Sequence, residues 1–171
     1  MTSSLSTNIG DRLKTAAEAH SNLENTMEAF NDPELTGLKT GSKNAQRLYR
    51  SAVIGLANDV QSLYTGIEGI YDLICKKHDG FVPQGDNTHQ QILDQMLKAT
   101  PSRPALLDAA EHKTMVELKN FRHVVRKNYG IKIDPTRVFE NAERMAKIWD
   151  AINSKIKHFA QRPNTPDSPS V

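Results

Sequence analysis

Apolar side chains, interrupted by one histidine, recur at alternating intervals of four and three residues near the start of the chain. This spacing puts them on one face of an α-helix. The stripe comprises Ile9, Leu13, Ala16, His20, Leu23, Met27 and Phe30. We expect the helix to stop at Asn31-Asp32-Pro33, and residues 31–42, with two glycines and one proline, to form a loop.

A second and longer helical pattern runs from about Lys43 to His78. Its last residues are basic, which suits the negative end of the helix dipole, and Gly80 follows as a terminator. The candidates for burial on this helix are Leu48, Ala52, Leu56, Val60, Leu63, Ile67, Ile70, Tyr71 and Ile74.

Two further helices are predicted before residue 130. Asn87, with Gln90 three residues later, forms a capping-box pattern that would start a short helix over residues 88–98. Pro104 is placed to open a longer helix from about Ala105 to Asn128.

The last predicted helix starts at Asp134-Pro135, a cap followed by a first-turn proline. Its stripe comprises Val138, Ala142, Met145, Trp149, Ile152, Ile156 and Phe159. The pattern as a whole predicts an all-α bundle of four long helices and one short helix. We expect residues 1–160 to form one domain, and residues 161–171, with three prolines in eleven positions, to be a disordered tail.

Composition and charge restrict the class of protein. The 171 residues carry 22 basic and 20 acidic side chains, a net charge of +2, so any basic site has to be local. The single cysteine, Cys75, fits a reducing cytoplasm and is expected to act as a small buried hydrophobe. The opening residues do not resemble a signal peptide, and no apolar run approaches the roughly 20 residues that span a bilayer. We expect a soluble cytoplasmic protein with no membrane segment.

Motifs for metals and nucleotides are missing from the sequence. The six histidines form neither an HxxH nor an HxxxH pair, which argues against a structured metal site. The glycines of GLKTGSK (37–43) lack the spacing and the preceding strand of a phosphate-binding loop. We therefore expect neither a metal nor a cofactor.

Residues 121–129 read FRHVVRKNY and concentrate positive charge on one predicted helix. On a helical wheel with Arg122 at zero, Arg126 lies at about 40° and Lys119 at about 60°. Tyr129 lies at about −20° by the same geometry, so Arg122, Arg126 and Tyr129 share one face beside the apolar stripe. His123 is expected to turn away, at about 100°.

This concentration of charge has two interpretations. In the first it is a solvated rim, with arginine heads in water or paired with Glu117 or Glu140. In the second it is an anion site, because arginines one turn apart can clamp a phosphate. A nearby tyrosine would then offer a stacking face, as in binders of single-stranded RNA, and a histidine or lysine could assist phosphodiester cleavage.

Three segments give the chain a resemblance to a known family. They are SLYTGIEGIYDLI (62–74), DGFVPQGDNTHQQILDQM (79–96) and FRHVVRKNYGIKIDPTRV (121–138). Residues 62–138 resemble the HepT-like group of the HEPN superfamily. The resemblance implies a HEPN-like helical bundle, commonly a homodimer, and in many members a metal-independent ribonuclease. It also implies a small nucleotidyltransferase partner, an antitoxin that adenylylates a tyrosine of the toxin.

The resemblance assigns roles to individual residues of the basic stretch. Arg122 matches the family's motif arginine and Tyr129 matches its modifiable tyrosine, whereas Lys127 stands where the family has histidine. A lysine ammonium is a poor general base at neutral pH, and His123 could substitute as the imidazole. Residue 127 diverges from Arg122 by about 140° in a regular helix, so a shared site needs a helix break near Gly130 or a second subunit.

Three hypotheses follow from these residues. The leading one is a HepT-like ribonuclease toxin, with Arg122, His123 and Lys127 catalytic, Lys119 and Arg126 binding RNA, and Tyr129 adenylylated. The alternative is a catalytically inactive HEPN module that binds RNA, a nucleotide or a partner protein. A structural helical adaptor would be favoured if Arg122 and Arg126 pair with carboxylates inside the bundle. His89, at the start of the short helix, is expected to be a helix-start hydrogen bonder rather than a catalytic residue.

Overall fold

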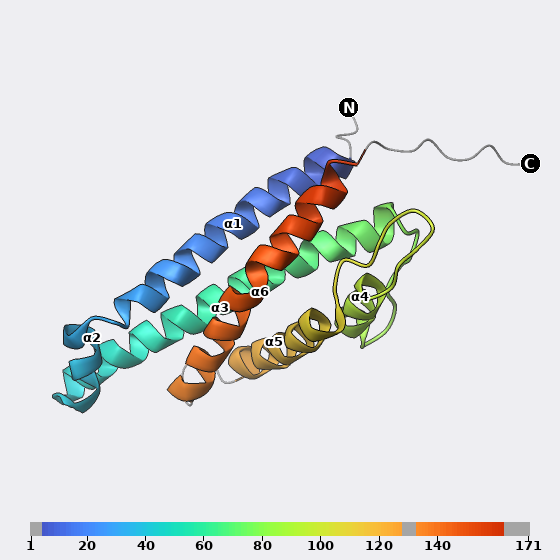
Figure 1. The fold of residues 1–171 in the computed structure, drawn as a ribbon. Coiled ribbons are helices and arrows are strands. Elements are labelled where there is room, and N and C mark those ends of the chain that lie inside the picture. Colours follow the sequence, from blue (N-terminus) through green and yellow to red (C-terminus); the bar gives the residue numbers. More distant parts are fainter. Residues whose placement is uncertain (1–4, 128–132, 163–171) are drawn as a thin grey trace, which may run out of the picture.

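The computed structural model of the chain describes residues 5–127 and 133–162, and helices dominate it (Figure 1). They are α1 (Leu5–Ala29), α2 (Pro33–Gly37), the 3₁₀ turn η1 (Leu38–Thr40), α3 (Lys43–Lys77), α4 (Thr88–Met96), α5 (Ala109–Lys127) and α6 (Pro135–Ala160). The described ranges contain no β-strand, only an isolated backbone bridge between Thr100 and Arg103. The predicted all-α bundle of four long helices and a short one is confirmed, with α2 and η1 in addition.

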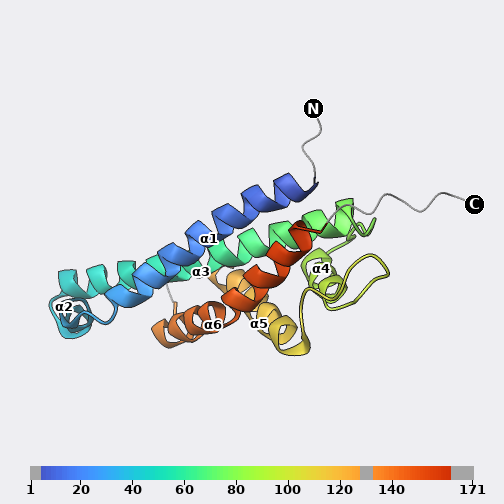
Figure 2. The ribbon, with the colours of Figure 1, turned by 45° about the horizontal axis from the view of Figure 1, so that its top comes forward.

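The long helices α1, α3 and α6 pack against one another along much of their length (Figures 1 and 2). α1 runs antiparallel to both α3 and α6, and the Ser6 hydroxyl donates a hydrogen bond of 2.7 Å to the Ala160 carbonyl, tying the start of α1 to the end of α6. α5 packs against α6 and α3, and α4 fills the corner between α3 and α5. This corner brings the three segments of the family resemblance together.

The predicted stripes form the core, with one clear exception. Every predicted position on α6 is buried, and His20 on α1 stacks on Trp149 with ring centroids 5.0 Å apart. The prediction for Leu48 is wrong, because its side chain is 61% exposed. Buried positions on α3 begin only at Val53. The first turns of α3 have the apolar spacing, but no described neighbouring element buries Leu48.

The segment after α1 is also different from the prediction. We expected Asn31-Asp32-Pro33 to stop one helix and begin a loop, but Asp32 also caps the short helix α2. Its side chain accepts a hydrogen bond of 2.8 Å from the Glu34 amide, and Pro33 occupies the first turn. Asp134 and Pro135 start α6 in the same way, as predicted, with the Asp134 side chain accepting from the Thr136 amide at 3.0 Å.

The start of α5 lies four residues later than predicted. Asp108 and Glu111 form a reciprocal capping box, each side chain accepting from the other's backbone amide at 2.8 Å. The amides of Leu106 and Leu107 donate to the Met96 carbonyl at the end of α4, and both leucines are buried. Residues 104–108 are therefore pinned against α4 before α5 can begin.

The capping box expected at the start of α4 is absent. Asn87 makes no side-chain cap. Gln90 instead donates to Asp94 and accepts from Lys119, so its side chain links α4 to α5. The single domain over residues 1–160 stays a prediction, and most of the predicted tail lies outside the described residues.

Two tyrosines on α3 give a stability prediction. The Tyr71 side chain is fully buried, and its hydroxyl has no hydrogen-bond partner among the described residues. Because an unsatisfied buried hydroxyl is unfavourable, we expect Tyr71→Phe to leave the free energy of unfolding unchanged or raise it by up to about 1 kcal/mol. Urea denaturation followed by circular dichroism measures this.

Tyr64→Phe is the matched control for that substitution. The Tyr64 hydroxyl is also buried but donates a hydrogen bond of 3.2 Å to the Glu68 carboxylate, so its removal should cost about 1.5–3 kcal/mol. A loss of more than about 1 kcal/mol in Tyr71→Phe would mean that its hydroxyl finds a partner after all.

Candidate active site

One face of α5 carries the basic residues that the sequence singled out. Met115, Leu118, Phe121 and Val125 form the buried stripe that seats the helix. Lys119, Arg122, His123 and Arg126 follow the spacing i, i+3, i+4, i+7 beside it, which is a single helical face. The neighbouring stripe therefore fixes the direction in which these four side chains point.

These four side chains line one pocket of about 430 Å³ between α5 and the start of α4. The remaining lining residues are Asp86, Asn87, His89, Gln90, Asn120 and Val124. Three permanent cations and one carboxylate, Asp86, line this pocket, and two imidazoles add further positive charge when protonated. A second carboxylate, Glu68, lies behind it, 3.9 Å from Arg122. The pocket is therefore suited to a polyanion.

Arg122 occupies the inner side of this pocket. Its side chain is only 16% exposed, and one terminal nitrogen lies 3.9 Å from an oxygen of Glu68. That distance is too long for a hydrogen bond, and no described residue accepts one from Arg122. Its guanidinium also lies over the Tyr64 ring, 5.9 Å from the centroid. Arg122 is thus held in place while its donors stay available to an anion.

Glu68 is the functional candidate that the sequence reasoning missed. It lies in the middle of the buried stripe of α3, and its side chain is 8% exposed. It accepts from the Tyr64 hydroxyl at 3.2 Å, contacts Nδ1 of His89, and faces Arg122. Burial and the Glu68 charge raise the pKa of Tyr64 well above its usual value, so this hydroxyl stays a donor. A charged residue on an otherwise apolar stripe was the signal that could have revealed it.

Lys119 is positioned by a chain of polar contacts. Its ammonium donates to the Gln90 side chain at 2.6 Å, Gln90 donates to Asp94 at 2.8 Å, and His112 contacts the same Asp94 oxygen at 2.7 Å. Burial alone would raise the pKa of Asp94, but these hydrogen bonds from Gln90 and His112 hold it below its usual value. The chain links α4 to α5 and leaves the cation of Lys119 at the edge of the pocket.

The predicted site residues are brought together only in part. Arg122 and Arg126 line the pocket together, on the face that the wheel gives them, and Lys119 lines it as well. Arg126 makes no ion pair with a described residue. The expectation that His123 turns away is wrong, because it lines the same pocket. Lys127 is exposed and is not one of the lining residues.

The helix break that could bring residue 127 back toward Arg122 does not occur before Lys127, the last described residue of α5. Tyr129 and Gly130 lie outside the described residues. The arginines of the basic stretch were also considered as partners of Glu117 or Glu140. These ion pairs do not form, because both carboxylates face Arg144 instead. The Arg122 contact with Glu68 is the one carboxylate pairing that the structure gives to the described part of this stretch.

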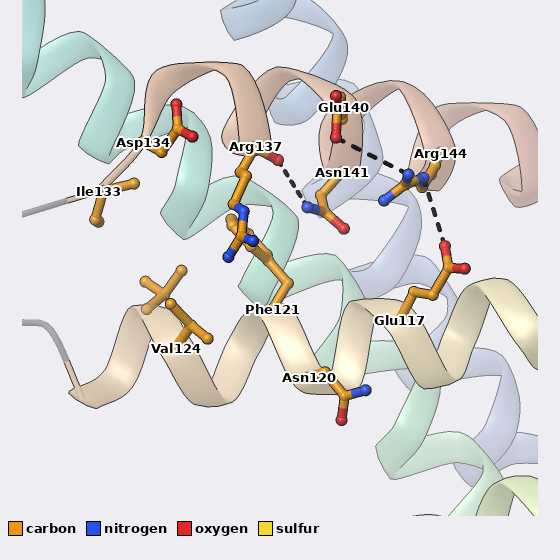
Figure 3. Close-up of a pocket in the computed structure, with 11 residues that line it drawn as sticks. Glu117, Asn120, Phe121, Val124, Ile133, Asp134, Arg137, Glu140, Asn141 and Arg144 are labelled. Carbon is orange, nitrogen blue, oxygen red and sulfur yellow. Dashed lines mark hydrogen bonds and ion pairs between the residues drawn. The ribbon is translucent and has the colours of Figure 1, made fainter.

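A second pocket, of about 470 Å³, lies on the other side of α5, against α6 (Figure 3). Arg144 lies 3.5 Å from Glu117 and 3.9 Å from Glu140 there, and Arg137 extends from α6 toward α5. Two cations share this pocket with the three carboxylates of Glu117, Asp134 and Glu140. This pocket is therefore a weaker candidate for an anion-binding site than the pocket around Arg122.

Other reactive groups give no competing site. No group of three or more His, Cys, Asp or Glu side chains that could hold a metal occurs within residues 5–127 and 133–162. Cys75 is buried as predicted, and burial raises the pKa of its thiol to about 12, so it is a poor nucleophile. None of the described helices contains an apolar stretch of the length that spans a bilayer.

Comparison with known proteins tests the resemblance. The family model described as HepT-like protein matches residues 55–163, which include all of α4, α5 and α6 and α3 from Gly55 onward. The chain belongs to the HepT-like family. No curated protein and no solved structure is significantly similar to the chain. The HepT-like match covers every residue that lines the pocket around Arg122, so the candidate active site lies within the family's own domain.

Proposed function

We propose that this HepT-like protein is a HEPN-type ribonuclease that cleaves RNA in the pocket around Arg122. One observation carries the proposal: three cations and two imidazoles line a single pocket inside the family-matched segment. Arg122 would bind the scissile phosphate with donors that no described residue occupies, and Lys119 and Arg126 would hold neighbouring phosphates. Such a pocket suits an RNA backbone better than a single small anion.

The proposed chemistry uses the RNA's own 2′-hydroxyl as the nucleophile. Its oxygen attacks the adjacent phosphorus, the bond from phosphorus to the 5′-oxygen breaks, and the products are a 2′,3′-cyclic phosphate and a 5′-hydroxyl. Arg122 would stabilise the charge that develops on the phosphoryl oxygens. His123, exposed at the pocket, would protonate the leaving oxygen.

The family membership supports a wider biological proposal. The protein would act in the cytoplasm as the toxin of a toxin–antitoxin pair, most simply as a homodimer. Its antitoxin would be a nucleotidyltransferase that adenylylates Tyr129 and so blocks RNA binding.

The test of cleavage is an assay with end-labelled RNA in the presence of a chelator. The protein preparation is first shown by mass to be unmodified at Tyr129. We expect fragments that carry a 2′,3′-cyclic phosphate, identified by their shift after phosphatase and acid treatment. RNA that stays intact at protein excess would contradict the ribonuclease proposal.

A catalytically inactive binding module is the second candidate, and Lys127 favours it. This residue stands where the family has histidine, and it does not line the pocket. The inactive module would bind RNA with an affinity that falls steeply with salt and would give no product.

RNA binding itself provides a prediction that both candidates share. Removing Lys119 and Arg126 together should weaken binding of single-stranded RNA and lower the slope of log K against log salt by about 1.4, since each lost phosphate contact contributes about 0.7. The measurement is a titration of fluorescent RNA at several salt concentrations.

A matched variant removes the same charges elsewhere. Lys113 and Arg50 are both exposed, and neither lines the pocket. We expect Lys113→Ala with Arg50→Ala to leave the slope within about 0.3 of wild type. Equal losses in both double variants would show that only net charge matters and would exclude this pocket as the RNA site.

A further inference from the structure

A contact between α3 and α4 holds a histidine beside the pocket around Arg122. His89 stands in the first turn of α4, and its Nδ1 contacts an oxygen of the buried Glu68 on α3. The Glu68 side chain is 8% exposed, whereas that of His89 is 47% exposed. The pair therefore has a fixed buried member and a member that reaches the pocket.

The chemistry of this contact sets the direction of the free nitrogen. An ionised carboxylate can only accept hydrogen bonds, so a neutral His89 donates from Nδ1 and keeps its lone pair on Nε2. A carboxylate that orients an imidazole in this way leaves the other ring nitrogen ready to take a proton. Both Glu68 oxygens are engaged, one by Tyr64 and His89 and the other by Arg122, so the carboxylate is fixed from three directions.

His89 lies between two pockets that charged side chains line. Its side chain lines both the 430 Å³ pocket and an adjoining one of about 330 Å³ on the side of α3. The titratable and charged groups that face these two pockets with it are Glu68, Asp72 and Lys76 from α3, Asp86 from the preceding loop, and Lys119, Arg122, His123 and Arg126 from α5. Cations for phosphate and an oriented imidazole thus meet in one place.

Lys127 does not provide this function. It is exposed and lies outside the pocket, and a lysine ammonium has no lone pair to accept a proton. His123 has the right chemistry, but no described carboxylate holds its ring. His89 is the one histidine lining this pocket whose ring is oriented by a described carboxylate.

We propose that His89 is the catalytic proton acceptor and Glu68 its positioning residue, an assignment that rests on the proposed ribonuclease function. Nε2 of His89 takes the proton of the 2′-hydroxyl while the 2′-oxygen bonds to phosphorus. The bond from phosphorus to the 5′-oxygen breaks, and that oxygen receives a proton from the imidazolium of His123. Arg122 balances the charge on the phosphoryl oxygens throughout.

The experiment is single-turnover cleavage of labelled RNA by the full chain, across a range of pH and in chelator. His89→Ala should cleave about 10²–10⁴-fold more slowly than wild type and lose the rising limb of the pH profile. Free imidazole should restore its rate in proportion to its concentration, whereas Arg122→Ala should not respond. Glu68→Gln, which keeps an acceptor for Nδ1 but not the charge, should cleave more slowly and shift the rising limb.

His158→Ala is the control, because His158 is an exposed histidine in the same family-matched segment but does not line the pocket. It should cleave at the wild-type rate with an unchanged pH profile. Thermal melting of each variant separates loss of fold from loss of chemistry.

The outcomes separate this proposal from the function on which it rests. Wild-type cleavage that survives in His89→Ala, or a loss that imidazole does not restore in folded protein, overturns the role of His89 and leaves the ribonuclease standing. Absence of cleavage by unmodified wild-type protein overturns both.

Discussion

Replacing Arg122 with alanine should reduce RNA cleavage by about 10²–10³-fold, the loss expected when one preorganised donor to a developing negative charge is removed. Arg122 is partly buried, lies over Tyr64 and faces Glu68 at 3.9 Å, so its position is set before RNA binds. The measurement is the single-turnover rate at saturating protein. Arg122→Lys should recover only part of the rate, since lysine keeps the charge but not the planar fork.

The control for Arg122→Ala comes from the neighbouring pocket. Arg137 is an exposed arginine in the same family-matched segment, but it lies between α5 and α6, among carboxylates. We expect Arg137→Ala to cleave at the wild-type rate. If Arg137→Ala loses activity and Arg122→Ala keeps it, the active site lies in the pocket of Figure 3, and the assignment made here is wrong.

The same buried carboxylate connects the fold to the proposed chemistry. Glu68 is placed by α3, touches Tyr64 on its own helix, and reaches His89 on α4 and Arg122 on α5. Burying a charge in this way destabilises the fold unless the charge is paired and hydrogen-bonded. The pocket therefore depends on the packing of three helices, and displacement of α4 would separate the imidazole from the arginine.

The helices of this fold could be predicted from the sequence because their signals are local. The stripes of α1 and α6 repeat every three or four residues, and the predicted positions are buried apart from His20 and Met27, which are partly buried. The prediction that Leu48 is buried was wrong because periodicity does not indicate where a partner helix begins to cover the apolar stripe. Asp32-Pro33 was interpreted only as a stop, although the same pair starts α6 at Asp134-Pro135.

The candidate site was predictable only where it lies on one helix. The spacing of Lys119, Arg122 and Arg126 gives their common face directly. The contacts of Glu68 with His89 and Arg122 join residues 21 and 54 positions apart in the sequence, and helical period contains no information on which helices meet. His123 was misplaced because the pocket spans a wider arc of α5 than the wheel argument allowed.

Arg103→Ala should lower the free energy of unfolding by about 3–5 kcal/mol, the cost of leaving a buried charge without its partner. The Arg103 side chain is 0% exposed, and the side chain of its partner Asp79 is 2% exposed. Nε and Nη2 donate to the two Asp79 oxygens at 2.9 and 2.5 Å. The remaining donors reach the carbonyls of Lys98, Pro104 and Gln95 at 3.0, 3.0 and 3.1 Å. All five guanidinium hydrogens are thus used to hold residues 97–108 against α4 and the loop that follows α3.

The control is Arg144→Ala, which removes an arginine with two exposed carboxylate partners, Glu117 and Glu140. An exposed pair contributes little, so this variant should lose less than about 1 kcal/mol in the same urea titration. Asp79→Ala should be about as unstable as Arg103→Ala, and the double variant should lose less than the two single losses added together. Equal small losses in Arg103→Ala and Arg144→Ala would contradict the structural role assigned to Arg103.

The pH dependence of stability provides an independent check on this pair. Burial alone would raise the pKa of Asp79, but hydrogen bonds from Arg103 and Gln95 hold it below its usual value. A carboxyl whose pKa is lower in the folded protein stabilises the fold above its unfolded pKa of about 3.9, and that stability is lost as pH falls through the folded pKa. The stability difference between wild type and Asp79→Asn should therefore be constant near neutral pH and shrink below about pH 4. A difference that stays constant down to pH 2 would mean that Asp79 binds its proton equally in the folded and unfolded states, so that Arg103 and Gln95 do not lower its pKa.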